Sequence, residues 1–178
     1  MGNNKNQWFT AVRERLTGGE QRAREKLYLE IREAIDRKDV LELAPKGSLI
    51  ARNTEDAADR YYAKGNMLEK LPYVDNYFDV VIVDSPHTLA EGDAAMAEID
   101  RVLKRNGVLI ALLFEKKRPG LRQQMLTMVN GVRLEHQQER KALMDFLHEH
   151  GWRVKRGRTF AAVVPLTYME CIRKEAKR

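Results

Sequence analysis

The sequence has a single cysteine, Cys171, so it cannot form an intramolecular disulfide. Its four histidines have no cysteine partners at zinc-binding spacing, and we expect no metal site. No apolar run approaches the roughly 20 residues that a membrane span needs, and the first residues lack the apolar stretch of a signal peptide. We therefore expect a cytoplasmic protein that makes no contact with a membrane.

The chain also lacks the composition of a disordered protein. Its 178 residues are 43% hydrophobic and 33% charged, which is enough to close one core and leave a solvated surface. The net charge of +6 is uneven, because residues 115–178 carry fifteen Lys and Arg against seven Asp and Glu. Such an excess attracts phosphates, but no aromatic platform is interleaved with it. We therefore favour a solvated basic surface over a nucleic-acid footprint.

Two amphipathic helices are predicted in the first forty residues, the second running to about residue 37. Their apolar residues stand at helical spacing: Trp8, Val12 and Leu16 in the first, and Leu27, Ile31, Ala34 and Ile35 in the second. We expect residues 1–38 to form a helical extension and residues 39–178 to form one α/β domain. Trp8, Phe9 and Val12 form a stripe that could dock on a partner or on a second copy. The alternative is that the stripe packs across the chain's own sheet.

Apolar runs after residue 39 predict the strands of a sheet, at Val40–Leu43, Phe78–Asp84 and residues 108–114. A helix predicted over residues 91–104 joins the last two, which should then be adjacent and parallel, with Asn106-Gly107 as the turn between helix and strand. Further helices are predicted over residues 119–130 and 135–150, the latter stopped by Gly151. Trp152–Phe160 and Leu166–Arg173 should form an antiparallel pair at the end of the chain.

The segment 44–65 leaves two interpretations open. In the first, the crossover helix after the first strand is lost, residues 49–52 form a short second strand, and a helix from about residue 57 ends at Gly65. In the second, the crossover helix is kept as residues 48–64 and the strand is lost. Either loss leaves one edge of the sheet poorly covered, and we expect the N-terminal helices or a second subunit to protect it.

Three stretches together resemble class I S-adenosylmethionine-dependent methyltransferases of the type 11 kind, over about residues 38–175: Val40-Leu41-Glu42-Leu43, residues 71–81 (LPYVDNYFDVV) and residues 98–110 (EIDRVLKRNGVLI). The most specific motif is E-x-x-R-V-L-K-x-x-G, which has a structural rather than a catalytic role in the family. The resemblance implies a Rossmann-like, mostly parallel sheet with a C-terminal antiparallel hairpin, reduced relative to the seven strands of the family. It also implies S-adenosylmethionine as cofactor and methyl transfer to an acceptor that the sequence does not identify.

The resemblance implies the following cofactor-binding positions: Glu42, Ala44, Gly47, Asn53, Asn66, Met67 and Asp84. Three features depart from the family. The loop after the first strand contains Pro45 and keeps one glycine, Asn53 stands where the family has a ribose-binding acid, and Asn66 stands where it has an Asp near the adenine. The alternative is therefore a catalytically silent methyltransferase-like subunit that acts as a scaffold or as the partner of an active enzyme, in a homo- or hetero-oligomer.

Candidate catalytic residues follow the central strand in Asp84-Ser85-Pro86-His87, at the sheet edge where open α/β folds bind ligands. The Asp84 carboxylate and the His87 imidazole could transfer a proton, or they could cap the next helix. Tyr61 and Tyr62 could stack on an adenine or complete a core. Because methyl transfer proceeds chiefly by positioning the acceptor, missing acid-base residues do not exclude activity, and the sequence leans towards an enzyme.

Overall fold

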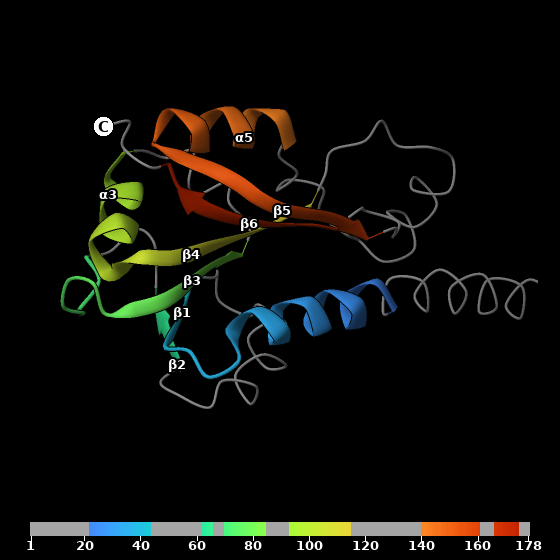
Figure 1. The fold of residues 1–178 in the computed structure, drawn as a ribbon, viewed down its shortest axis with the longest axis horizontal. Coiled ribbons are helices and arrows are strands. Elements are labelled where there is room, and N and C mark those ends of the chain that lie inside the picture. Colours follow the sequence, from blue (N-terminus) through green and yellow to red (C-terminus); the bar gives the residue numbers. More distant parts are fainter. Residues whose placement is uncertain are drawn as a thin grey trace, which may run out of the picture.

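The structure, a computed structural model, describes residues 22–43, 62–65, 70–84, 93–114, 140–160 and 166–174. Its strands form one six-stranded sheet in the order β2-β1-β3-β4-β6-β5 (Figure 1). They are β1 (Val40–Leu43), β2 (Tyr62–Gly65), β3 (Phe78–Asp84), β4 (Leu103–Phe114), β5 (Trp152–Phe160) and β6 (Leu166–Arg173). The helices are α3 (Asp93–Val102), α5 (Arg140–Glu149) and a helix over residues 22–35.

The pairing of the strands divides the sheet into a parallel and an antiparallel part. β1 pairs in parallel with both β2 and β3, and β3 pairs in parallel with β4. β6 runs antiparallel to β4 on one side and to β5 on the other. The predicted fold class, the adjacent parallel central strands and the C-terminal antiparallel pair are therefore confirmed.

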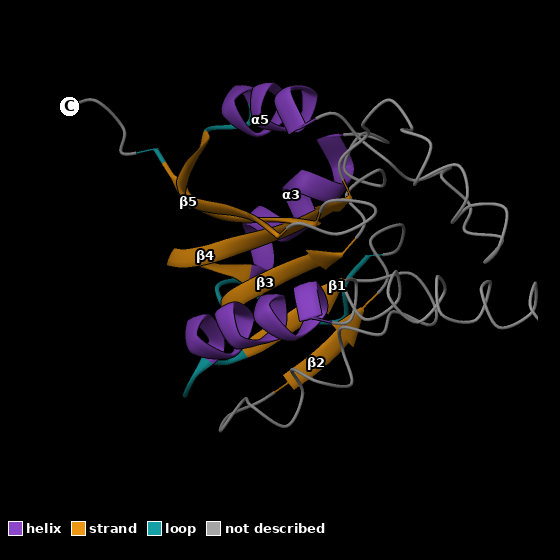
Figure 2. Cartoon of the chain, turned by 90° about the vertical axis from the view of Figure 1, so that its right-hand side faces the viewer, coloured by secondary structure: helices purple, strands orange, loops and turns teal. Residues whose placement is uncertain are grey.

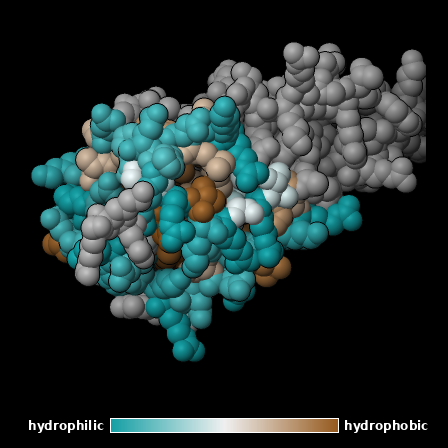
Figure 3. Space-filling view, turned by 45° about the horizontal axis from the view of Figure 1, so that its top comes forward, coloured by the Kyte–Doolittle hydropathy of each residue, from teal (hydrophilic) through white to brown (hydrophobic). Residues whose placement is uncertain are grey.

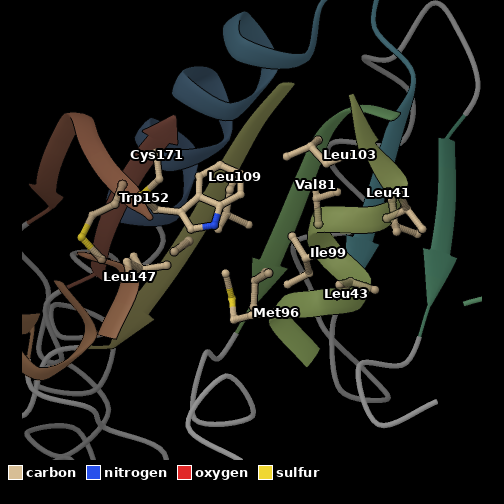
Figure 4. Packing of buried hydrophobic residues seen from close by; sticks show 14 of the residues in the cluster. Leu41, Leu43, Val81, Met96, Ile99, Leu103, Leu109, Leu147, Trp152 and Cys171 are labelled. Carbon is tan, nitrogen blue, oxygen red and sulfur yellow. The ribbon is translucent and has the colours of Figure 1, made fainter. Parts of the chain in front are cut away.

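Alternation along the strands gives the sheet two apolar faces, one on each side. Leu41, Val81 and Leu109 face α3 and α5, and this core also contains Met96, Ile99, Leu147 and Trp152 (Figure 4). Val40, Val80 and Ile110 face the helix over residues 22–35, which Figure 2 shows in front of the sheet. Strands that are covered on both sides explain the uninterrupted apolar run of residues 80–83.

The second N-terminal helix is confirmed, and it packs on the sheet of its own chain. Its residues Leu27, Ile31 and Ile35 are at most 2% exposed, and burying each such side chain stabilises the fold by about 1.5–3 kcal/mol. The predicted first helix, with Trp8, Phe9 and Val12, lies outside the described residues. Protection of the sheet edge by that helix or by a second subunit stays a prediction.

β2 corrects the prediction for the end of segment 44–65. Residues 62–65 are a strand that pairs with β1 from Val40↔Tyr62 to Leu43↔Gly65, so a helix that ends at Gly65 and a helix over residues 48–64 are both wrong for these residues. The helical spacing of the nearby alanines and tyrosines is a weak local preference, and pairing with the edge of β1 outweighs it. The strand predicted over residues 49–52 lies outside the described residues.

The junction of α3 and β4 corrects the prediction, because the helix ends earlier, the strand begins earlier, and no turn separates them. The helix ends at Val102 rather than at residue 104, because the carbonyls of Arg101 and Val102 accept hydrogen bonds from the amides of Asn76 (2.8 Å) and Tyr77 (2.9 Å). The strand begins directly afterwards, and the predicted turn at Asn106-Gly107 lies within β4. The register jumps there from Phe78↔Leu103 to Val80↔Val108.

α5 confirms the second half of the helix predicted over residues 135–150. It ends at Glu149, and Gly151 follows with a φ of 81°, a left-handed conformation that glycine adopts without strain. The helix predicted over residues 119–130 lies outside the described residues. Within the described residues, no helix has the length and apolar character needed to span a membrane.

Candidate cofactor site

The carboxyl ends of β1, β2, β3 and β4 meet at one edge of the sheet. Their register aligns Leu43 with Gly65 on one side and with Val83 on the other, and Val83 with Ala111 in turn. Asp84, the last residue of β3, lies one step further along. The fold thus brings two predicted site positions, Glu42 and Asp84, to the same edge on neighbouring strands.

Glu42 is only 1% exposed, which is unusual for an acidic residue. Its neighbours Leu41 and Leu43 belong to the core under α3 and α5, so alternation directs Glu42 to the opposite side, where its register partner Ile82 is also buried. A buried carboxylate is costly unless polar groups compensate it. Glu42 accordingly takes part in an interaction within the protein.

The other predicted positions fall in the connections that leave these strands. Ala44, Gly47 and Asn53 follow β1, Asn66 and Met67 follow β2, and His87 follows β3; all of them lie outside the described residues, as does Tyr61. Asp84 is placed by its backbone, which pairs with Leu112. The described residues therefore supply the floor of the site, formed by the strand ends.

The E-x-x-R motif of α3 lies away from this floor and holds the chain that enters β3. Arg101 donates from Nη1 to the carbonyl of Tyr73 (2.6 Å) and from Nη2 to the carbonyl of Leu71 (3.0 Å). Glu98 accepts from the amide of Leu71 (3.0 Å) and from Nη2 of Arg101 (2.7 Å). The hydrogen bond with Arg101 lowers the pKa of Glu98 to about 2. This geometry agrees with the structural role expected for the motif.

The lysine of the same motif joins three strands at their amino ends. Nζ of Lys104 lies 2.7 Å from Oδ1 of Asp79 and 3.6 Å from Oδ2 of Asp39. Oδ2 of Asp79 also accepts a hydrogen bond from the amide of Asp39 at 3.0 Å. Residues that stabilise the fold thus gather at the amino ends of β1, β3 and β4, at the edge opposite to Glu42 and Asp84.

Two further chemistries find no support among the described residues. No group of three or more His, Cys, Asp or Glu in that part of the chain is placed to hold a metal ion. Cys171 is buried, and burial raises the pKa of its thiol to about 12. The thiol therefore stays protonated at neutral pH and is a poor nucleophile.

Comparison with known proteins begins with a family model described as a methyltransferase domain, which matches residues 27–111, slightly less than half of the chain. A ubiquinone/menaquinone biosynthesis C-methyltransferase (UbiE) from Paraburkholderia phymatum is 51% identical over 49 residues, and its counterpart from Paraburkholderia phytofirmans is 49% identical over the same length. Each match covers 27% of this chain and 20% of the relative. The chain thus spans about one fifth of the length of these enzymes.

Solved structures extend the likeness to most of the chain. One is the 1,6-didemethyltoxoflavin-N1-methyltransferase of Burkholderia thailandensis with bound 1,6-didemethyltoxoflavin and S-adenosylhomocysteine (TM-score 0.63, 13% identity, 96% of this chain and 87% of that chain). Another is a SAM-dependent methyltransferase of Aquifex aeolicus (TM-score 0.59, 17% identity, 84% and 89%). A third comes from the complex between the Haloferax volcanii Trm112 methyltransferase activator and a methyltransferase (TM-score 0.58, 12% identity, 96% of this chain and 97% of that chain). At these identities the likeness establishes the fold.

The resemblance inferred from residues 40–43, 71–81 and 98–110 agrees with both findings. The family model covers all three stretches, and the fold is similar to those of the solved methyltransferases. Residues 27–111 therefore match a methyltransferase domain, and the fold of the chain is similar to that of solved S-adenosylmethionine-dependent methyltransferases.

Proposed function

We propose that the chain is an S-adenosylmethionine-dependent methyltransferase domain that acts on an acceptor still to be identified. The observation that carries this proposal is the meeting of Glu42 and Asp84 at the carboxyl ends of β1 and β3, within the segment that matches the family model. Open α/β sheets bind their ligands at this edge. The activity of the curated relatives is not carried over as such, because the matched segment is only about one fifth of their length.

The chemistry of the strand ends fits the cofactor. An ionised carboxylate only accepts hydrogen bonds, and S-adenosylmethionine offers an ammonium group and two ribose hydroxyls as donors. Glu42, buried at the end of β1, and Asp84, at the end of β3, supply such acceptors. Ala44 and Gly47 follow β1 in the sequence, and Asn66 and Met67 follow β2, so these four positions remain candidates beside Glu42 and Asp84. Asn53 and His87 remain candidates from the sequence alone.

The chemical step asks little of the protein beyond positioning. When bound, the cofactor supplies a methyl group on a sulfonium, which transfers to a nucleophile held in line with the carbon–sulfur bond. The residues of the chain would hold the cofactor, orient the acceptor and exclude water. Asp84 and His87 are the candidates to take up a proton that the acceptor releases.

A second proposal, the catalytically silent subunit, is motivated by the contrast between the two ends of the sheet. The E-x-x-R clamp and the Lys104 bridge are intact, whereas Pro45, Asn53 and Asn66 depart from the family pattern. In this case the predicted first helix, with Trp8 and Phe9, would dock on a partner or on a second copy. Changing both residues to Ser should then alter the mass that light scattering measures, and an unchanged monomer would count against docking.

The two proposals differ in cofactor binding, which isothermal titration calorimetry measures. An enzyme should bind S-adenosylmethionine, and Glu42→Gln should weaken binding at least tenfold, since a hydrogen bond to a charged group contributes about 1.5–3 kcal/mol. Gly47→Val should weaken it as well by crowding the approach to the loop. Glu33→Gln is the matched control, because Glu33 is exposed on the helix over residues 22–35. Unaltered affinity in both site variants would mean that the site is misplaced, and no heat at millimolar cofactor would reject the enzyme.

We also propose a cytoplasmic location. The lone cysteine forms no intramolecular disulfide, and it is buried as a free thiol. Proteins of reducing compartments use cysteine in this way. Recovery of the activity or of the protein in the soluble cytoplasmic fraction of the source cells would test this location.

A further inference from the structure

The outermost strand β5 is unusually basic. Residues 153–158 include four cations, Arg153, Lys155, Arg156 and Arg158, in the sequence R-V-K-R-G-R. The surrounding described residues, 140–160 and 166–174, carry eight Lys and Arg against three Asp and Glu. The side of the molecule that carries α5 is largely hydrophilic (Figure 3). Among these described residues, positive charge therefore gathers around β5.

A bulge brings three of these arginines onto one face. The register of β5 against β6 runs from Arg153↔Ile172 through Val154↔Cys171 to Arg156↔Glu170 and Arg158↔Tyr168, so Lys155 has no partner on β6. Without the bulge Arg153 would face away from Arg156 and Arg158. With it, the three arginines stand opposite every second residue of β6, about 6.7 Å apart on one side of the sheet. We call Arg153, Arg156 and Arg158 the arginine row.

One carboxylate holds part of this row in place. Glu30, on the helix over residues 22–35, forms ion pairs with Arg156 (2.7 Å) and with Arg158. Its side chain is 10% exposed, whereas those of the two arginines are 35% and 53% exposed. The guanidinium groups are thus fixed on one side and open to solvent on the other.

The remaining cations of the strand are unopposed. Arg153 and Lys155 are exposed, and neither forms an ion pair with the described part of the chain. On the other face, Nη2 of Arg140 lies 3.5 Å from the place where a Cβ on Gly157 would stand, so α5 adds a further positive charge beside the strand. Glu30 therefore neutralises only part of the charge around β5.

We propose that β5 binds the phosphate backbone of single-stranded nucleic acid, at a site separate from the cofactor edge. Guanidinium groups pair with phosphate oxygens in a two-pronged geometry, and a row at regular spacing suits a polymer of evenly spaced phosphates. Trp152 and Tyr168 nearby are at most 1% exposed, and Phe160 at the end of β5 is packed, half-buried, against the core under the helix over residues 22–35, so no fully exposed aromatic ring of the described residues lies beside the arginines. Binding therefore involves phosphates alone, depends strongly on salt and is indifferent to base sequence.

The measurement is fluorescence anisotropy of labelled U20 RNA and T20 DNA with the full chain, between 50 and 200 mM salt. We expect both probes to bind with similar affinity. The variant R153Q/K155Q should reduce the slope of log affinity against log salt by about 1.4, since each phosphate contact on a single strand contributes about 0.7. The control K70Q/R105Q removes two exposed cations outside β5, Lys70 in the segment before β3 and Arg105 on β4, and it should keep the slope of the unmodified chain. Urea midpoints of all variants establish that each is folded.

Several outcomes would overturn the site. Basic residues and a bulge also protect a sheet edge against pairing with other strands, and if that is their only role neither probe binds at 50 mM salt. An equal change of slope in K70Q/R105Q would mean that net charge, and not β5, governs binding. Binding of polyglutamate that is lost in R153Q/K155Q, without binding of either nucleic acid, would assign the surface to an acidic protein partner instead.

Discussion

Gly107, the last residue of the E-x-x-R-V-L-K-x-x-G motif, is expected to tolerate no side chain. A Cβ there would lie 2.6 Å from both Cγ and Cδ1 of Leu103 and 2.9 Å from the carbonyl oxygen of Lys104. Leu103 is fully buried and cannot swing away freely. Forcing a methyl group into such a site costs about 1–3 kcal/mol, and the loss of chain entropy in the unfolded state returns about 0.4–1 kcal/mol. The net destabilisation of Gly107→Ala is therefore about 1–2 kcal/mol.

Urea unfolding followed by circular dichroism measures this difference, and thermal unfolding should show a Tm lower by about 2–8 °C for a domain of this size. Gly157→Ala is the matched control, because the nearest atom to its Cβ, Nη2 of Arg140, is at an ordinary contact distance of 3.5 Å. The control should change stability by less than about 0.5 kcal/mol. If Gly107→Ala is as stable as the unmodified protein, the steric explanation of this glycine is wrong.

Three further predictions concern charged groups. The pKa of Glu98 is lowered to about 2 from its ordinary 4.5, so its stabilising effect is present above pH 4.5 and is lost as the pH falls towards 2. The difference in urea midpoint between the unmodified protein and Glu98→Gln should therefore shrink as the pH falls through that range. A difference that stays constant would refute the stabilising role of the ionised Glu98. Hydrogen bonds to the carbonyl of Phe146 and to Asp93 raise the pKa of His150, so its stabilisation is present below its ordinary pKa of 6.5 and is lost as the pH rises through the raised value. Asp93→Asn should weaken that pH dependence, and an identical stability profile between pH 5 and 8 would contradict the pairing. Glu30→Gln leaves Arg156 and Arg158 without their carboxylate and should destabilise the chain by about 1–3 kcal/mol. The control Glu33→Gln, at an exposed position, should not destabilise it. Equal urea midpoints for the two variants would mean that the ion pairs of Glu30 do not stabilise the fold.

The central part of the fold was predictable because its signals are local. The apolar run of β3, the amphipathic pattern of α3 and the apolar run of β4 define a parallel pair without any knowledge of the rest of the chain. Gly151 ends α5 as its position after the periodic residues indicates. The two strand segments expected after Gly151 likewise form the antiparallel pair of β5 and β6.

The features that the sequence did not predict depend on contacts between distant residues. β2 is a strand because β1 offers it an edge, a condition that four residues of mixed character cannot encode. Lys104 and Asp79 are 25 residues apart, and Glu30 and Arg158 are 128 apart, so no spacing rule connects them. Glu30 left one signal, an acid beside the apolar stripe of an amphipathic helix, but the bulge that presents Arg156 and Arg158 to it has no local signature.

Sequence reasoning selected Glu42 and Asp84 as candidate site residues, and the strand register brings them to one edge, but their role in binding a cofactor stays a prediction. Both were selected from the resemblance to the family's sequence motifs and from the rule that ligands bind at the carboxyl ends of parallel strands. The clamp residues Glu98 and Arg101 were visible as a motif, but their contact with Leu71 and Tyr73 was not. A motif on its own does not reveal which segment it holds.

The location of the cofactor site is tested most directly by NMR on the isotopically labelled chain titrated with S-adenosylhomocysteine. The amides of Leu43, Gly65 and Asp84, at the carboxyl ends of β1, β2 and β3, should shift progressively with ligand. The amides of Asp39, Asp79 and Lys104, which belong to the ion-pair cluster at the amino ends, should not move. Shifts confined to the amino ends, or none at millimolar ligand, would contradict a methyltransferase site at the carboxyl edge of this sheet.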